Sequence, residues 1–267
     1  MQVNKDTKLL FFDIDGTLIT DDMRRILPDS VVSGIREARK NNALTFINTG
    51  RVFCNIEQSL RDIGFDGYVC GCGGYIRFND EVLYHKKYNQ DICREIAYKC
   101  RDFNLTAIFE HTDKTCYDKE MNNSRRDTIV EYFANATYKL VDDIESDGFI
   151  FDKFSGWYSK GFDVEGFKNY ISPYFDYIDR EGDFCEMAPK GHSKATGIKF
   201  LLDFFGLPIH NAYVFGDGNN DLEMLKFVPN SICMSGGSEL AMKTASYITE
   251  PVLEDGIYKA LKHFNII

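Results

Sequence analysis

Several features that would assign the chain to a compartment are missing from its 267 residues. No apolar run approaches the roughly 18 residues that a membrane-spanning helix needs. The opening residues, Met-Gln-Val-Asn-Lys-Asp, contain no apolar export signal. Positive charge is also scarce, because 31 Lys and Arg face 41 Asp and Glu, for a net charge of −10. We therefore expect a cytoplasmic protein whose main partner is neither a membrane nor a nucleic acid.

Paired metal-binding or disulfide motifs are missing as well. The eight cysteines are scattered, and Cys70-Gly-Cys72 has no second pair that would complete a zinc site. The five histidines show no spacing typical of metal ligands. These patterns predict reduced thiols that are mostly buried.

Short apolar runs that end in turn residues are present near both ends of the chain. Buried strands are predicted over Leu9–Phe12, Leu44–Arg51, Gly67–Cys72 and Asn211–Gly216. Amphipathic or capped segments between and after them predict helices over 30–40, 52–63 and 194–205. Strands that alternate with helices in this way favour an α/β fold with a doubly wound, Rossmann-like parallel sheet.

The middle of the chain has a different pattern, in which strands follow one another through short polar turns. We expect hairpins around 79–81 and 111–113, helices over 90–103, 124–134 and 164–171, and strands over 148–154, 175–180 and 183–187. This pattern predicts an α+β module with an antiparallel sheet, inserted into the first domain. The expected boundaries are 1–79 and 187–267 for the discontinuous core and 80–186 for the module.

Two carboxylates, Asp13 and Asp15, directly follow the first predicted strand. Side chains alternate along an extended chain, so both point to the same side. The carboxyl ends of parallel strands are where ligands bind in open α/β sheets, and two like charges there require a cation or a shared proton. Other strand ends or nearby turns carry Thr49, Lys194, Asp217, Asn220 and Asp221, and the helix expected after Gly50 would add backbone N–H groups. Such a set suits a hard divalent cation, Mg²⁺ foremost, together with an anion such as phosphate.

These residues strongly resemble the motifs of the haloacid dehalogenase superfamily, specifically its Cof-type phosphatases with a type IIB cap. Asp13-Ile-Asp-Gly-Thr-Leu18 matches the first motif of the family and Thr49-Gly-Arg51 the second. The stretch 186–194 matches the third motif and 216–224 the fourth. The insertion lies where the family keeps its α+β cap domain, so the module at 80–186 is expected to be that cap.

The resemblance implies roles for the matching positions. Asp13 would be the nucleophile that becomes phosphorylated, and Asp15 would protonate the leaving alcohol and then activate water. Mg²⁺ would be held by Asp13, by the backbone carbonyl of Asp15 and by Asp217, with Asp221 on a metal-bound water. The implied catalytic residues are Asp13, Asp15, Thr49 and Lys194, and the implied phosphate or substrate contacts are Gly16, Thr49, Gly50, Arg51, Lys194 and Asn220.

The resemblance implies a Mg²⁺-dependent phosphatase that acts on small phosphorylated metabolites, with sugar phosphates favoured. The expected oligomeric state is a monomer or a weak homo-oligomer. A phosphotransferase or phosphomutase that uses the same aspartyl phosphate is the alternative, and a non-catalytic sugar-phosphate sensor is a third. The sequence leaves two alternatives for each of two side chains. Arg51 either reaches the substrate or pairs with a core acid. Trp157 either stacks on a ligand or packs internally, and packing is favoured. The basic pair Arg24-Arg25 is expected to be solvated surface.

Overall fold

The computed structural model describes residues 3–121, 127–129, 131, 140–141, 144–180 and 182–267. The chain folds as two compact units. The core unit comprises Met1–Gly50, Gln58–Leu83 and Ser193–Ile267, and the inserted unit comprises Arg51–Glu57 and Tyr84–His192. An α/β core interrupted by an α+β insertion was predicted, and the two sheets described below confirm that fold class.

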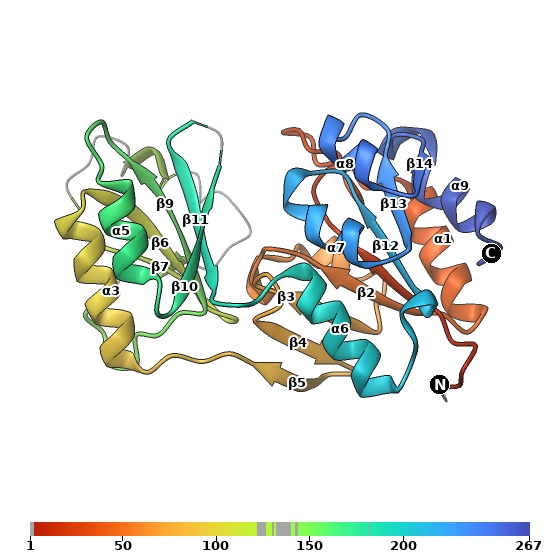
Figure 1. The fold of residues 1–267 in the computed structure, drawn as a ribbon, viewed down its shortest axis with the longest axis horizontal. Coiled ribbons are helices and arrows are strands. Elements are labelled where there is room, and N and C mark those ends of the chain that lie inside the picture. The colour runs from red at the N-terminus through yellow and green to blue at the C-terminus, as the bar shows by residue number, and fades with distance from the viewer. Residues whose placement is uncertain (1–2, 122–126, 130, 132–139, 142–143, 181) are drawn as a thin grey trace. The chain divides into compact units, whose positions relative to one another are not determined.

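The core unit is built on an eight-stranded sheet with the order β14-β13-β12-β1-β2-β3-β4-β5 (Figure 1). The strands from β14 to β3 pair in parallel, and β4 is antiparallel to β3. Their bounds are β1 Leu9–Phe12, β2 Leu44–Asn48, β3 Gly67–Cys70, β4 Tyr75–Phe78, β5 Glu81–His85, β12 Ala212–Gly216, β13 Asn230–Met234 and β14 Tyr247–Thr249.

Central position in this sheet explains the apolar sequence of β1. Its neighbours β2 and β12 cover both edges, and all four of its side chains are fully buried. Phe11 stacks on Phe46 of β2, and Phe12 stacks on Phe215 of β12, with ring centroids 5.2 and 4.5 Å apart. A strand that is buried on both faces has no polar side to alternate, so it appears as a continuous apolar run.

Helices cover both faces of the core sheet. Figure 1 shows α1 and α9 together on one side, with α6 and α7 on the other. Contacts agree, because α1 packs on α9 whereas α7 packs on both α6 and α8. Their bounds are α1 Asp29–Lys40, α2 Gln58–Arg61, α6 Lys194–Phe205, α7 Leu222–Phe227, α8 Glu239–Thr244 and α9 Gly256–His263, and single 3-10 turns lie at η1 Phe53–Asn55, η2 Ile209–Asn211, η3 Asn219–Asp221 and η4 Val252–Glu254.

The inserted unit has a six-stranded sheet with the order β10-β11-β9-β6-β7-β8. Its pairs are antiparallel except for β7 and β8, which are parallel. The strands are β6 Leu105–Glu110, β7 Thr115–Tyr117, β8 Leu140–Val141, β9 Lys153–Tyr158, β10 Phe175–Asp179 and β11 Phe184–Pro189, and the helices are α3 Gln90–Asp102 and α5 Val164–Ile171.

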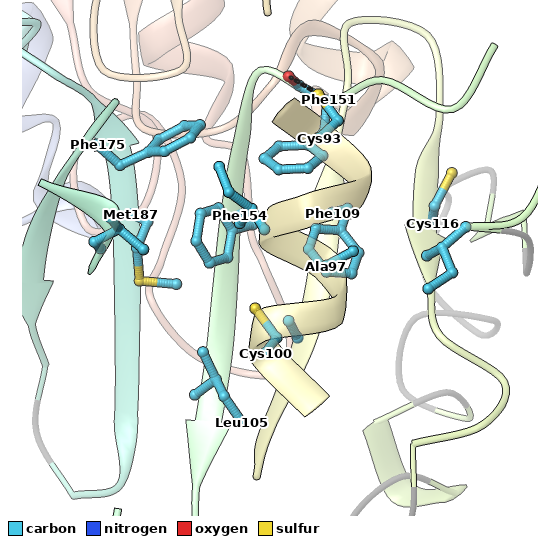
Figure 2. Close-up of a cluster of buried hydrophobic side chains, with 14 of the residues drawn as sticks. Cys93, Ala97, Cys100, Leu105, Phe109, Cys116, Phe151, Phe154, Phe175 and Met187 are labelled. Atoms are coloured by element: carbon cyan, nitrogen blue, oxygen red, sulfur yellow. Dashed lines mark hydrogen bonds between the residues drawn. The ribbon is translucent and has the colours of Figure 1, made fainter. Parts of the chain in front are cut away.

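A phenylalanine-rich core joins these helices to the sheet. Figure 2 shows Phe109, Phe151, Phe154 and Phe175 gathered beside the α3 residues Cys93, Ala97 and Cys100. The ring centroids of Phe109 and Phe151 are 5.0 Å apart, and those of Phe154 and Phe175 are 5.2 Å apart. The unit therefore has a hydrophobic core of its own, as expected for an inserted domain.

Three predicted elements differ from the structure. The segment predicted as a helix over 52–63 is only the turn η1 and the four-residue α2. Its residues are tied to the inserted unit instead: the Cys54 N–H donates to the carbonyl of Thr112, and the Asn55 amide donates to Glu110 at 3.2 Å. Contacts far along the chain thus override the local helical pattern.

The strand expected over 148–154 begins only at Lys153 and continues to Tyr158, because that stretch is paired by both β6 and β11.

The hairpin around 79–81 forms, but β4 and β5 extend the core sheet, and the second unit begins at Tyr84 on this side. The helix predicted over 124–134 lies mostly outside the described residues. Seven of the eight cysteines are buried, in agreement with the prediction of mostly buried thiols. Every helix in the described part of the chain is too short or too polar to cross a membrane.

A buried charge network occupies β9 and β11 of the inserted unit. The Lys153 ammonium lies 3.4 Å from Glu186 and 3.6 Å from Glu110. The Arg180 guanidinium donates to Glu186 at 3.1 Å. Burial raises the pKa of Glu186, but the charges of Lys153 and Arg180 outweigh that effect and lower the pKa to about 2.

The substitution Glu186→Gln should destabilise the protein near neutral pH. The folded pKa of Glu186 lies below the unfolded value, so its stabilising effect is present above about pH 4.3 and is lost as the pH falls towards 2. We expect a loss of about 1–3 kcal/mol at pH 7, discounted for partial exposure, that shrinks at pH 3. Urea unfolding at both pH values measures the loss, and Glu239→Gln, at an exposed ion pair, is the control. An equal loss at pH 7 and pH 3 would contradict the assignment.

Candidate active site

Three adjacent strands bring the predicted carboxylates together. In the core sheet β1 lies between β2 and β12, with Phe12 in register with both Ile47 and Phe215. Asp13 follows β1 directly, and its N–H donates to the carbonyl of Phe215 at 3.0 Å. Because parallel strands end at the same edge, the residues after β1, β2 and β12 meet there, which places Asp13, Thr49 and Asp217 at one edge of the sheet.

Lys194 enters this edge from the start of α6. Ser193 and Thr196 form a capping box that fixes the first turn of the helix. The Lys194 side chain is 3% exposed, and its ammonium group donates to the carboxylates of both Asp13 and Asp221. The distance to Asp221 Oδ1 is 2.6 Å. One buried cation therefore links residues that lie far apart in the sequence.

Asp217 and Asp221 are held by the turn that follows β12. Asp221 is fully buried, and its Oδ2 accepts the N–H groups of Asp217 and Gly218, each at 3.0 Å. Asp217 accepts the hydroxyl hydrogen of Thr17 at 2.8 Å. One oxygen atom from each of Asp13, Asp217 and Asp221 lies within 4.8 Å of the others.

The balance of charge at this cluster is negative, with three carboxylates around one ammonium. Burial, together with the charges of Asp221 and Asp217, raises the pKa of Asp13 to about 8 despite Lys194. Burial and Asp221 likewise raise the pKa of Asp217 to about 7. Burial lowers the pKa of Lys194, but the two carboxylates outweigh it and raise the pKa overall. The uncompensated negative charge and the all-oxygen donor set fit a hard divalent cation.

Asp15 has a partner that was not expected. Its carboxylate accepts a hydrogen bond from Arg25 at 3.0 Å, and both side chains are about one-third exposed. Arg24 points elsewhere, to Asp22 at 2.6 Å, and is 66% exposed. The expectation of solvated surface is therefore wrong for Arg25, because the loop that follows β1 turns it back onto Asp15. Asp15 does not belong to the carboxylate cluster, and metal binding through its backbone carbonyl stays a prediction.

The remaining predicted residues are distributed over both units. In the core unit Thr49 is 2% exposed, Gly50 is half-buried and Asn220 is exposed. Arg51 belongs to the inserted unit, where it donates to Glu57 at 2.9 Å and to the carbonyl of Asn55 at 3.3 Å. Since no continuous helix follows Gly50, the expected helix N-terminus for an anion is absent among the described residues.

Trp157 is half-buried and lies against Phe184 in the inserted unit, with ring centroids 4.7 Å apart. Two polar contacts of the site were not predicted from the sequence, those of Thr17 and Arg25. Thr17 was visible as the hydroxyl of the first motif, directly after Gly16, but its bond to Asp217 depends on the pairing of β1 and β12. No pattern in the sequence around Arg25 indicated its contact with Asp15.

Gly16 allows the close approach of the first and fourth motifs. Its φ is +76°, and a Cβ atom there would lie 2.3 Å from Asp217 Oδ2. Gly206, at the end of α6, has a similar φ of +65° but nothing within 4 Å of such a Cβ atom. An alanine at position 206 would therefore introduce backbone strain alone, whereas an alanine at position 16 would add a clash with the carboxylate of Asp217.

Gly206→Ala should cost about 1–2 kcal/mol through backbone strain alone. We expect Gly16→Ala to cost more, because Asp217 must also move away, and we expect the double variant Gly16→Ala, Asp217→Gly to recover part of the difference. Urea unfolding of the four proteins measures these free energies. Equal losses for Gly16→Ala and Gly206→Ala would show that the close approach to Asp217 has no energetic consequence.

Known proteins resemble both the sequence and the fold. The family model for haloacid dehalogenase-like hydrolases matches residues 10–261. YkrA of Bacillus subtilis strain 168, whose name assigns it to the phosphatases, is 26% identical over 265 residues, which cover 98% of this chain and 99% of YkrA. A crystal structure of a hypothetical protein from Geobacillus kaustophilus HTA426 has a TM-score of 0.84 at 26% identity, with 98% of this chain and all of that one covered. The structure of the subclass IIB sugar phosphatase BT4131 has a TM-score of 0.80 at 27% identity, with the same coverage. The chain therefore belongs to the haloacid dehalogenase-like hydrolases, as a Cof-type member of subclass IIB.

Proposed function

We propose that this HAD-type phosphatase hydrolyses phosphomonoesters of small metabolites, sugar phosphates foremost, through a phosphoryl group carried by Asp13. The observation that carries the proposal is the Lys194 ammonium held between Asp13 and Asp221, beside Asp217, at the carboxyl edge of the core sheet. The preference for sugar phosphates is supported by the similarity to BT4131, a sugar phosphatase.

Asp13 is the proposed nucleophile. A carboxylate oxygen of Asp13 forms a bond to phosphorus while the ester oxygen of the substrate leaves, so the phosphoryl group is transferred to the aspartate. This attack brings together two anions, and the ammonium of Lys194 lowers the repulsion between them. The side chain of Asp13 is held by that same contact and is 6% exposed, which fixes its direction before the substrate arrives.

Asp15 is the proposed proton carrier. It would give a proton to the leaving oxygen and then take one from the water that attacks the phosphoryl group on Asp13, which restores free Asp13 and releases phosphate. Its greater exposure and its separation from the carboxylate cluster suit a group that must exchange protons. Arg25 orients the Asp15 carboxylate.

Asp13 and Asp217 are the residues that would hold Mg²⁺, with Asp221 beside them. When bound, the ion would offset the negative charge of the cluster and polarise a phosphoryl oxygen. The buried hydroxyl of Thr49 and the backbone at Gly50 are the proposed contacts for the phosphoryl oxygens, together with Lys194. The exposed Asn220 is assigned to substrate orientation only.

Transfer to a second sugar hydroxyl is the alternative outcome of the same chemistry. It requires the phosphoryl group on Asp13 to meet an alcohol instead of water. Incubation with one sugar phosphate and an excess of a second, unphosphorylated sugar separates the two outcomes, because a phosphatase releases inorganic phosphate whereas a transferase yields the second sugar phosphate.

The substitution Asp13→Asn should lower phosphate release at least about a thousandfold, since an amide is a poor nucleophile. Phosphate release from a panel of sugar phosphates measures the loss, and circular dichroism checks the fold. Asp203→Asn, at an exposed ion pair on α6, is the matched control and should retain activity. In wild type, acid quenching during turnover should trap a phosphoryl group on the peptide that contains Asp13. Undiminished activity in Asp13→Asn would rule out the nucleophile.

Removal of divalent metal should stop turnover, and Mg²⁺ should restore it. EDTA leaves three carboxylates around one ammonium, so we also expect Mg²⁺ to raise the melting temperature of wild type, by about 2–4 °C per kcal/mol of binding free energy. Asp217→Asn removes a proposed ligand and should abolish this increase. Thermal unfolding with and without Mg²⁺ measures it, and an equal increase in both proteins would exclude Asp217 as a ligand.

A further inference from the structure

A second cluster of metal-binding side chains lies in the inserted unit, far from the carboxylates of the core unit in sequence. It consists of His85, His111 and Asp152, and one ligand atom of each lies within 4.8 Å of the others. His85 ends β5, His111 follows β6 and Asp152 precedes β9, so three separate elements contribute. We propose that these side chains form a transition-metal site, with Zn²⁺ as the metal that suits it best.

The donor atoms distinguish this cluster from the Asp13 cluster. Two imidazoles and one carboxylate form a mixed nitrogen and oxygen set, which Zn²⁺ and related transition metals prefer, whereas Mg²⁺ prefers oxygen alone. Three protein ligands leave the fourth tetrahedral position for water or a small anion. The site therefore selects a different ion from the one proposed at Asp13.

Asp152 supplies independent support, because one of its two carboxylate oxygens has no partner among the described residues. Its side chain is 7% exposed, and Oδ1 contacts His85 Nε2 at 2.7 Å. No hydrogen-bond partner for the buried Oδ2 is found among the residues that the structure describes. A buried carboxylate oxygen without a partner is costly, and a cation at the cluster would satisfy it.

His111 is oriented as metal-binding histidines usually are. Its Nδ1 lies 2.6 Å from the carboxylate of Asp113, and that contact favours the tautomer with hydrogen on Nδ1. The lone pair of Nε2 is then available to a metal. The ring centroids of His111 and His85 are 5.9 Å apart.

The backbone around the cluster is well fixed. The Asp152 N–H donates to the carbonyl of Glu110 at 2.8 Å, and the His111 N–H donates to the carbonyl of Lys114 at 2.9 Å. Tetrahedral ligands of one Zn²⁺ lie about 3.3 Å apart, so only a small opening of the 2.7 Å contact between His85 and Asp152 is needed. A simple ion pair of His85 and Asp152 would require neither the nearby imidazole of His111 nor its Asp113 contact.

Metal titration of the whole chain tests the proposal. Wild-type protein is freed of metal with EDTA, returned to buffer with excess Mg²⁺ to occupy the carboxylate cluster, and titrated with Zn²⁺ by calorimetry. We expect one Zn²⁺ per chain, at least about tenfold weaker binding for His111→Gln and Asp152→Asn, and about tenfold weaker binding for the outer variant Asp113→Asn. His210→Gln, which removes an exposed histidine elsewhere, is the control and should bind as wild type does.

Co²⁺ in place of Zn²⁺ identifies the donor atoms. Imidazole and carboxylate ligands should give weak visible bands without an intense thiolate band, and the visible bands should be lost in His111→Gln. Circular dichroism and melting in EDTA show that each variant is folded, and Asp113→Asn, at the surface, keeps the test valid if a buried variant does not fold. Unchanged Zn²⁺ affinity in His111→Gln and Asp113→Asn, an equal loss in His210→Gln, or a strong thiolate band would each overturn the proposal.

Discussion

The contact of the Lys194 ammonium with Asp13 and Asp221 is the interaction on which the core site depends. A buried ammonium needs carboxylate partners, and three neighbouring carboxylates cannot all stay charged without a cation. The contact therefore lowers the free-energy cost of burying both the ammonium and the carboxylates. The same contact joins the end of β1, the start of α6 and the turn after β12. Because one cation offsets only part of the negative charge, the cluster is suited to a second, divalent cation and to a phosphoryl group.

Parallel strand pairing creates the geometry that this contact needs. With β1 between β2 and β12, loops that are distant in the sequence all leave the same edge of the sheet. Close approach at that edge requires residues without side chains, and Gly16 and Gly216 meet this need beside Asp217 and Asp221 respectively. The glycines of the first and fourth motifs therefore allow the two motifs to pack closely, in addition to allowing the chain to turn.

The inserted unit follows a different principle, with one apolar and one polar side to its sheet. The phenylalanine core binds α3 and α5 to one side, while Glu110, Lys153 and Glu186 form a buried charge network through β6, β9 and β11. His85 at the end of β5, His111 after β6 and Asp152 before β9 meet in this unit. The unit thus has both its own core and its own candidate metal site, and neither requires a residue of the core unit.

The sequence by itself determined the fold class with its two sheets, and it indicated which residues lie at the carboxyl edge of the core sheet. Buried strands such as β1 have continuous apolar runs, and the acids and glycines that follow them are local signals, so Asp13, Thr49, Lys194, Asp217 and Asp221 were all predicted. Only the tertiary structure decided which residues Arg25 and Arg51 contact. It also decided that no continuous helix forms over 52–63, and that His85, His111 and Asp152 lie together. Histidine spacing gave no indication of that cluster, because the pairing of β6 with β9 brings His111 near Asp152, and His85 reaches Asp152 from the end of β5. Local patterns report on burial and turns, whereas the partner of a long charged side chain depends on which distant segments the fold places beside it.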